Sequence, residues 1–528
     1  MKTIINKILV GSLALAAATA CTSDFENINS NPYEPGDLTP DDYAIGSAMN
    51  NMASTVMSGD VNTLQFTDCL LGGPLGGYFS DSNAGFTESI IRYNPKDDWS
   101  RVFLKSDKVI AQLYSNMTMI EAFAETSGDE LPLGVAKVIK VATMHRVADT
   151  YGPIPYTKIG TGGNLATPYD SSPEVYKAFF DELDEALAIL HAHAGDALSP
   201  SSDFTFRGDI SKWIKFANSL KLRLALRISN TTADRTLAKQ MAEEAVADGV
   251  MTSNADNAAW DYFQTSTNPM YTAVNYNSGD NEYKTGGDTH AAADIICYMN
   301  GYNDPRREAY FLKSGWAGTE YIGLRRGWQT YANSWGFKFS GVNIKANDPL
   351  VWMNAAEVAF LRAEGSVLGF EMGGTAQSFY EEGIRLSFEQ WGAGDASEYI
   401  ADATSMPQAY SDPSNANPYN GSMSTITIAW DEAATLDQKV ERIITQKWIA
   451  NWLNGCESWC DIRRTGYPQL IPVAANMSGG VVYSNIGPQR MPYPQEEYTN
   501  NSANVTEAVN KYLGGTDNMA VKLWWAKK

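Results

Sequence analysis

The stretch SKWIKFANSLKLRLALRIS, residues 211–229, repeats apolar residues at steps of three and four. Because such steps return to one side of an α-helix, the pattern predicts an amphipathic helix whose apolar seam faces a core. Its basic residues fall off the seam, and in so acidic a chain we expect them to be solvated or salt-bridged, not membrane-bound. The seam comprises Trp213, Ala217, Leu220, Leu224 and Ile228, and the basic residues are Lys212, Lys215, Arg223 and Arg227.

The same periodicity extends outward on both sides of this stretch. Residues 172–195 predict a helix with a Ser172 cap and Pro173 in its first turn, and residues 133–152 predict another that Gly152 and Pro153 end. Residues 351–369 and 375–392 form two helical patterns around a Gly373-Gly374 turn, and a capping box from Thr435 to Gln438 opens a further helix. The sequence therefore predicts a mostly α protein built from helix pairs like tetratricopeptide units, although no strict repeat is present.

Three long segments rich in Gly, Asn, Ser and aromatic residues interrupt the helices: 59–100, 252–348 and 394–430. They are too long for simple connectors, so we expect functional loops. Aromatic rings beside short polar side chains form a surface that binds sugars, and peptides can bind to the same kind of surface. The alternative is that these rings belong to the core. We place a ligand site where residues 72–86 and 260–335 converge. The stacking candidates are Tyr78, Phe79, Trp316, Trp328 and Trp335, and the polar candidates are Asn277, Asp280, Asn281 and Arg326.

The net charge and composition of the chain exclude some classes of function. A formal net charge of -21 opposes binding to phosphate backbones and anionic lipid, which excludes a nucleic-acid partner. Apolar residues make up 44% of the chain and charged residues 19%, as in globular proteins. The cysteines are too few and too scattered to stabilise so long a chain through disulfide bonds. Cys456 and Cys460 are better explained as two packed thiols than as a strained disulfide.

No sequence motif identifies a catalytic centre or a cofactor site. His191 and His193 have a spacing that binds metal from a strand, but near a helix end they point to different sides, so we expect no metal there. His145 is expected to be a core or interface histidine. A carboxylate pair for glycoside hydrolysis stays possible, because the required separation is spatial.

The N-terminus has the anatomy of a secretory signal. Residues 1–20 hold a basic start, an apolar core and small residues, and Ala-Thr-Ala-Cys then places Cys21 as in a bacterial lipobox. We expect Cys21 to carry a thioether-linked diacylglycerol and an N-acyl chain, which together anchor a protein firmly. Residues 21–40 then form a flexible tether, and residues 41–528 form one helical domain with loop insertions.

Six segments of the chain together resemble one known family. They are HRVADTYGPIPYT (145–157), WIKFANSLKLRLALRIS (213–229), FLRAEGSVLG (360–369), QKWIANWLNGCESWCDIRRTGYPQL (446–470), RMPYPQEEYTNN (490–501) and NPYEP (31–35). In wording, order and spacing they resemble the SusD/RagB-like outer-membrane lipoproteins of Bacteroidota, in particular the SusD-like branch with a leading NPYEP-type segment. The family usually carries a small residue at the position of Cys460, and this departure puts no function in doubt.

The resemblance implies a right-handed superhelix of tetratricopeptide-like helix pairs with ligand-binding loops. It also implies a non-catalytic, nutrient-binding lipoprotein on the cell surface, acting as a lid on a SusC-type TonB-dependent transporter and needing no cofactor. The motifs around Asp149 and Arg463 are then helix stops and packing features, because Gly and Pro punctuate them. The sequence does not decide between a glycan and a peptide as the ligand. Two competing hypotheses are a secreted glycoside hydrolase and a purely structural adhesin.

Overall fold

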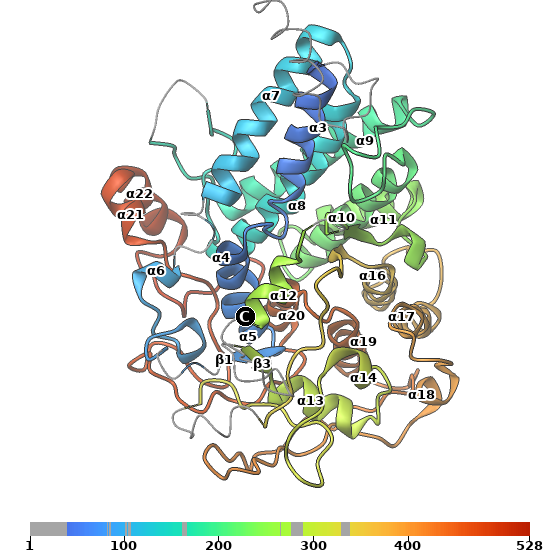
Figure 1. The fold of residues 1–528 in the computed structure, drawn as a ribbon, viewed down its shortest axis with the longest axis vertical. Helices are drawn as coiled ribbons and strands as arrows, with labels where there is room; N and C mark the ends of the chain where they lie inside the picture. Colours follow the sequence, from blue (N-terminus) through green and yellow to red (C-terminus); the bar gives the residue numbers. More distant parts are fainter. Residues whose placement is uncertain are drawn as a thin grey trace, which may run out of the picture.

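The computed structural model describes residues 40–81, 83, 86–100, 103, 107–160, 166–263, 266–275, 289–328 and 338–527. The signal segment, Cys21 and nearly all of the tether lie outside these residues. Helices dominate the described chain, as its apolar periodicity predicts (Figure 1). Within these ranges, no helix combines the length and the apolar character that a membrane span requires.

The long helices pack side by side as consecutive pairs, like the two helices of a tetratricopeptide unit. In Figure 1 the pairs succeed one another from the top of the view, through the green helices, to the yellow ones at the right. This arrangement confirms the predicted fold class. The pairs are α3 (Pro40–Ala53) with α7 (Gln112–Ser127), α8 (Leu131–Tyr151) with α9 (Ser172–Ala192), α10 (Ile210–Ile228) with α11 (Arg235–Asp248), and α16 (Ala355–Val367) with α17 (Ala376–Gln390).

Helix α10 is the helix that residues 211–229 predict. Every residue of its predicted seam is buried, and Asp209 caps its start by accepting hydrogen bonds from the backbone N–H groups of Ser211 and Lys212. Helix α9 corrects one detail, because its cap is Ser171, in a capping box with Glu174, and not Ser172. The predicted capping box at Thr435 is confirmed at the start of α19 (Leu436–Ala450).

The hairpin of α16 and α17 depends on small residues where the helices meet. A Cβ added at Gly383 of α17 would lie 2.7 Å from the Phe360 ring of α16, closer than packed atoms tolerate. Ala356 and Ala363 are fully buried on α16. Close approach of the two helices therefore requires glycine at position 383.

The segments predicted as loops contain more regular structure than expected. Their elements are too short to show a clear apolar period, which is why the sequence did not reveal them. Residues 59–100 hold α4 (Val61–Leu64), η1 (Gln65–Gly72), α5 (Gly73–Leu75), β1 (Phe79–Asp81), η2 (Ile90–Arg92) and α6 (Asp97–Ser100); residues 252–348 hold η5 (Asn254–Asp256), β2 (Ala258–Trp260), α12 (Pro269–Val274), β3 (Thr289–Ala291), α13 (Ala293–Gly301) and α14 (Arg307–Tyr310); residues 394–430 hold α18 (Ser397–Ala401).

The remaining elements close the structure around the helix pairs. Strand β4 (Leu350–Met353) pairs antiparallel with β2, and α19 packs against α16 and α17. Helix α20 (Gly455–Thr465) packs against η1 and α5, so a C-terminal segment covers an N-terminal one. The others are η3 (Asp107–Ala111), α21 (Gln495–Asn500) and α22 (Ser502–Tyr512).

Candidate functional site

The two regions expected to hold the ligand do meet in space. Strand β1 pairs antiparallel with β3, with Phe79 opposite Ala291 and Ser80 opposite His290. The indole N–H of Trp328 donates to the backbone oxygen of Asp81, at 2.5 Å. The glycine-rich segment and the aromatic segment are therefore joined by backbone pairing and by a side chain, in the lower part of Figure 1.

Three of the predicted stacking rings belong to the core at this junction. Tyr78, Phe79 and Trp328 are 0%, 1% and 3% exposed. The Tyr78 hydroxyl donates to the backbone oxygen of Trp448 at 2.5 Å, and the Phe79 ring meets the Trp452 ring edge-on at 5.6 Å between centroids. A ring with no exposed face cannot stack on a ligand, so in this structure these rings serve packing, which corrects our assignment.

The predicted polar residue Arg326 is also a structural residue here. It is buried, and its guanidinium donates to the Asp294 carboxylate from Nε at 2.8 Å and from Nη2 at 3.3 Å. Its Nη2 group also donates to the backbone oxygen of Ile471, at 2.7 Å. Arg326 therefore ties the aromatic segment to residues 470–477, which pair with it through backbone hydrogen bonds from Ala474 and Ala475.

A ligand-binding role for the other candidates stays a prediction. Trp316 is half-buried against Phe339, with the Lys338 ammonium 4.8 Å from its ring centroid. Trp316 and Trp328 share a small apolar cluster with Tyr419 and Met423. Outside the described residues lie Trp335, Asn277, Asp280 and Asn281.

A cavity of about 410 Å³ opens beside Arg326, and all three predicted loop segments reach it. Leu75 and Tyr93 come from the first segment and Arg326 from the second. The third segment supplies Tyr419, Ser422 and Met423, and the rest of the wall comes from residues 459–472 and 484–489 and from Lys522 and Lys527. This cavity has the size of a small-molecule site and lies where the long segments converge.

The wall combines apolar and aromatic surface with neutral hydrogen-bonding groups. Tyr419 is half-buried, with the Arg325 guanidinium 5.3 Å from its ring centroid, and Ile486 is 49% exposed. The amides of Gln469 and Asn485 and the hydroxyl of Ser422 supply donors and acceptors on the exposed side. Sequence reasoning missed residues 459–489 because their Gly and Pro residues indicated only structural turns.

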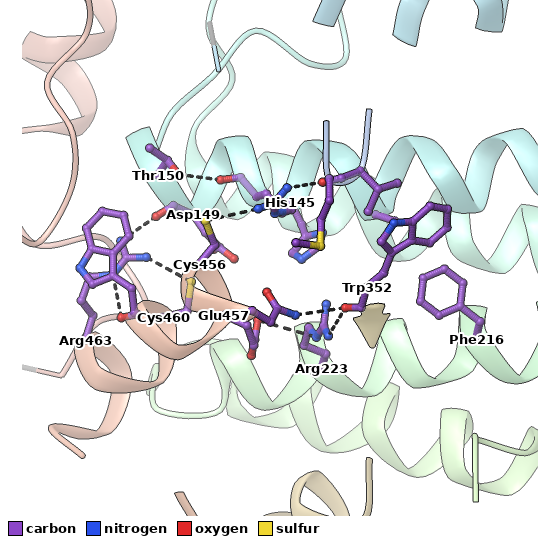
Figure 2. A pocket seen from close by; sticks show the side chains of 16 residues that line it. His145, Asp149, Thr150, Phe216, Arg223, Trp352, Cys456, Glu457, Cys460 and Arg463 are labelled. Carbon is purple, nitrogen blue, oxygen red and sulfur yellow. Dashed lines mark hydrogen bonds and ion pairs between the residues drawn. The ribbon is translucent and has the colours of Figure 1, made fainter. Parts of the chain in front are cut away.

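A buried network of charged side chains, drawn in Figure 2, shares Trp459 and Arg463 with the wall of this cavity. Figure 2 shows His145 and Asp149 of α8, Arg223 of α10, and Glu457 and Arg463 of α20 around a central gap. The gap measures about 20 Å³, which is room for one water molecule and not for a ligand. The network therefore joins helices and does not bind a nutrient.

Cations surround the Glu457 carboxylate of this network. Burial alone would raise the pKa of Glu457, but Arg227, Lys447 and Arg223 outweigh it and hold that pKa well below its usual range. Burial lowers the pKa of His145 to about 3, so its imidazole is neutral, with Nδ1 3.0 Å from the backbone oxygen of Val141. His145 is thus a core histidine, as expected.

The thiols and surface histidines have ordinary structural surroundings. Cys456 and Cys460 are free and buried, as predicted for packed thiols. His191 lies 2.9 Å from the Asp248 carboxylate and His193 lies 2.8 Å from the Asp196 carboxylate. Among the residues that the structure describes, no group of three or more His, Cys, Asp and Glu side chains is placed to hold a metal ion.

Comparison with known proteins shows what this architecture resembles. A SusD-like family model, described as SusD and RagB outer membrane lipoprotein, matches residues 27–526. No curated protein matches. A crystal structure of a SusD homologue from Bacteroides uniformis is 56% identical, covers 92% of this chain and 100% of its own, and has a TM-score of 0.89.

Two further solved structures extend the likeness at lower identity. A SusD homologue from Bacteroides ovatus is 39% identical, with 92% of this chain and 99% of its own covered and a TM-score of 0.82. A chitin-binding SusD homologue from Flavobacterium johnsoniae is 36% identical, with 91% and 98% covered and a TM-score of 0.82.

Proposed function

The chain belongs to the SusD-like family of outer membrane lipoproteins, and on this premise we propose that it captures oligosaccharide at the cell surface and delivers it, as a lid, to a SusC-like TonB-dependent transporter. The observation that supports a ligand role is the cavity beside Arg326, because three segments far apart in sequence all reach it. A solved relative is a chitin-binding protein, which favours glycan over peptide as the ligand.

The chemistry of the cavity wall suits a sugar. The Tyr419 ring offers a face to sugar C–H groups, while Gln469, Asn485 and Ser422 offer hydrogen bonds to hydroxyls. A cavity of about 410 Å³ accommodates a few sugar rings, with the chain continuing into solvent. The lipid on Cys21 would hold this open face near the membrane while the domain moves on its tether.

Titration calorimetry of the mature protein tests the ligand class. Oligosaccharides from chitin, cellulose, xylan and pectin are compared with peptides of similar length. We expect binding to oligosaccharide, and we expect Tyr419→Ala to weaken it about tenfold, which is the scale of a hot-spot truncation. The matched control is Tyr262→Ala, which removes an exposed tyrosine outside the cavity and should leave affinity unchanged. Binding to peptides alone would favour the peptide alternative, and release of cleaved sugars would favour a hydrolase.

The transporter partnership needs a separate experiment. A lid that opens and closes must hold its partner through a broad face while the tether stays fixed. Purification of the tagged protein from native membranes in mild detergent is therefore expected to recover a large TonB-dependent barrel. Repeated recovery of the protein alone, at native expression, would contradict the lid.

A further inference from the structure

The cavity beside Arg326 is positively charged in a strongly acidic protein. Its wall contains Arg326, Arg463, Lys522 and Lys527, and within the described residues it contains no Asp or Glu. The chain as a whole has a formal net charge of -21. A concave surface of one sign concentrates ligands of the opposite sign, so this local reversal of charge needs an explanation.

Of the four cations, Arg326 is already neutralised by Asp294, but Arg463 forms no ion pair, and the Asp149 carboxylate acts on it only from beyond ion-pair distance. Arg463 is 3% exposed and lies between two indoles, with its guanidinium carbon 3.5 Å from the Trp459 ring centroid and 4.8 Å from that of Trp525. Its hydrogen bonds go to neutral acceptors: the backbone oxygens of Asp149, Gln489 and Trp459 and the Cys460 sulfur. No carboxylate oxygen of the described chain lies within ion-pair distance of it.

This lack of a partner is unusual for a buried cation in this molecule. Buried arginines such as Arg146, Arg306 and Arg464 pair with carboxylates. Among the buried arginines and lysines of the described residues, the exceptions are Arg92, Arg442 and Arg463, and of these only Arg463 lines the cavity. Burial lowers the pKa of Arg463 to about 9, so the group is still a cation at neutral pH.

Lys522 and Lys527 stand at the exposed side of the same cavity. The Lys522 ammonium donates to the backbone oxygen of Lys527 at 2.8 Å, and the Lys527 ammonium donates to that of Thr465 at 2.9 Å. An ammonium group has three N–H donors, so each lysine keeps two for a ligand. Within the part of the chain that the structure describes, neither lysine has a carboxylate partner.

We propose that this cavity takes an acidic glycan, a sugar chain bearing carboxylate or sulfate groups, with Lys522 and Lys527 bonding the anionic group. The inference rests on the proposed function, since it takes the ligand to be a glycan in this cavity. Arg463 acts as a positioning charge: it is screened from direct contact, but its field is weakly shielded by the protein around it and favours an anion in the cavity. Tyr419, Gln469 and Asn485 bind the neutral part of the sugar.

The test compares ligands that differ in charge and hardly in shape. Oligogalacturonate and its methyl ester form one pair, and chondroitin oligosaccharides with and without sulfate form the other. Affinities are measured by titration calorimetry on the mature protein at low and high salt. We expect one of the acidic forms to bind at least tenfold more tightly than its less charged counterpart, and the advantage to shrink at high salt.

Variants then locate the anion. Lys522→Gln and Lys527→Gln are each expected to weaken acidic-glycan binding about fivefold to tenfold, while the control Lys345→Gln, an exposed lysine outside this cavity, leaves it unchanged. Both lysines are exposed, so these variants are expected to fold, unlike a change at buried Arg463. Unchanged affinity in both lysine variants would overturn the placement.

The outcomes separate this inference from the proposed function. Equal binding of charged and neutral forms, or binding of neutral glycans alone, overturns the acidic-glycan inference and leaves the capture of oligosaccharide standing. Binding of acidic peptides with no binding of any glycan overturns both. A preference for the sulfated form in the chondroitin pair alone identifies sulfate as the anionic group, and a preference for the free acid in the oligogalacturonate pair alone identifies carboxylate.

Discussion

Arg223 and Glu357 form a two-point ion pair between α10 and α16. The guanidinium donates from Nε to Oε1 at 2.8 Å and from Nη2 to Oε2 at 2.7 Å, and both side chains are buried. The two residues are 134 positions apart in the chain. This pair therefore fixes how two neighbouring helix pairs of the fold sit against each other.

Removing one partner of this pair should be strongly destabilising. In Glu357→Gln the Arg223 charge stays buried and loses its main counter-charge, so the free energy of unfolding should fall by about 3–5 kcal/mol. Urea unfolding followed by circular dichroism measures this. The double variant Arg223→Met/Glu357→Leu removes both charges, so its free energy of unfolding should fall by less than that of the single variant. A double variant that is less stable than Glu357→Gln would show that the pair itself, and not the orphaned charge, dominates.

Gly455 allows α20 to lie directly on the N-terminal segment. A Cβ at this position would lie 2.3 Å from the Gly72 carbonyl carbon, so Gly455→Ala must displace backbone. We expect a loss of about 1–3 kcal/mol of stability, seen as a lower melting temperature. Gly195→Ala is the matched control, because no atom lies within 4 Å of its added Cβ, and its stability should change by less than about 1 kcal/mol. Equal melting temperatures of the two variants would contradict the close approach.

Much of the fold follows from local periodicity, but the partners of its charged residues do not. Trp213 and Ile228 are buried on α10 because a repeating apolar seam places them there. Arg223 and Arg227 lie off that seam and are buried as well, since Glu357 and Glu457 approach them from distant helices. Such tertiary pairing leaves no mark in the spacing of one helix.

The region of the candidate site was predictable in part, but its residues were not. Composition identified three of the segments that converge on the cavity, because their Gly, Asn and aromatic residues suit ligand loops, but it did not identify residues 459–489. It did not separate Tyr78, which is fully buried against Trp448, from Tyr483, which is 69% exposed. Both tyrosines follow glycine-rich sequence, and only contacts made from distant segments decide which ring reaches solvent.

Lipidation of Cys21 is a prediction from the sequence that membership of an outer membrane lipoprotein family supports. We expect Cys21→Ala to fail processing or to leave the membrane fraction, because the acyl chains are lost. Fractionation with immunodetection checks this, and mass spectrometry of the native N-terminus identifies the modification. A free, unacylated Cys21, or a mature chain that starts at another residue, would contradict the anchor.

Acid should destabilise the protein through His145. Burial, with a further contribution from nearby Arg223, lowers the pKa of His145 from 6.5 to about 3. Below pH 6.5 His145 therefore binds a proton in the unfolded chain, whereas in the folded chain it stays neutral down to about pH 3. The stabilisation that comes from keeping His145 neutral is complete above pH 6.5 and is lost as the pH falls through this window.

The expected size of this loss is about 1.4 kcal/mol per pH unit, the value for uptake of one proton on unfolding. Other buried groups, such as His290 and Glu457, contribute to the total pH dependence, so the wild type must be compared with His145→Gln. Glutamine retains a donor for the Val141 carbonyl but binds no proton in this range. The free energy of unfolding in urea, measured from pH 4 to pH 7, should therefore fall less steeply with acid in the variant. Parallel curves for the two proteins would show that His145 binds its proton at the same pH in the folded and the unfolded chain, which would contradict the prediction.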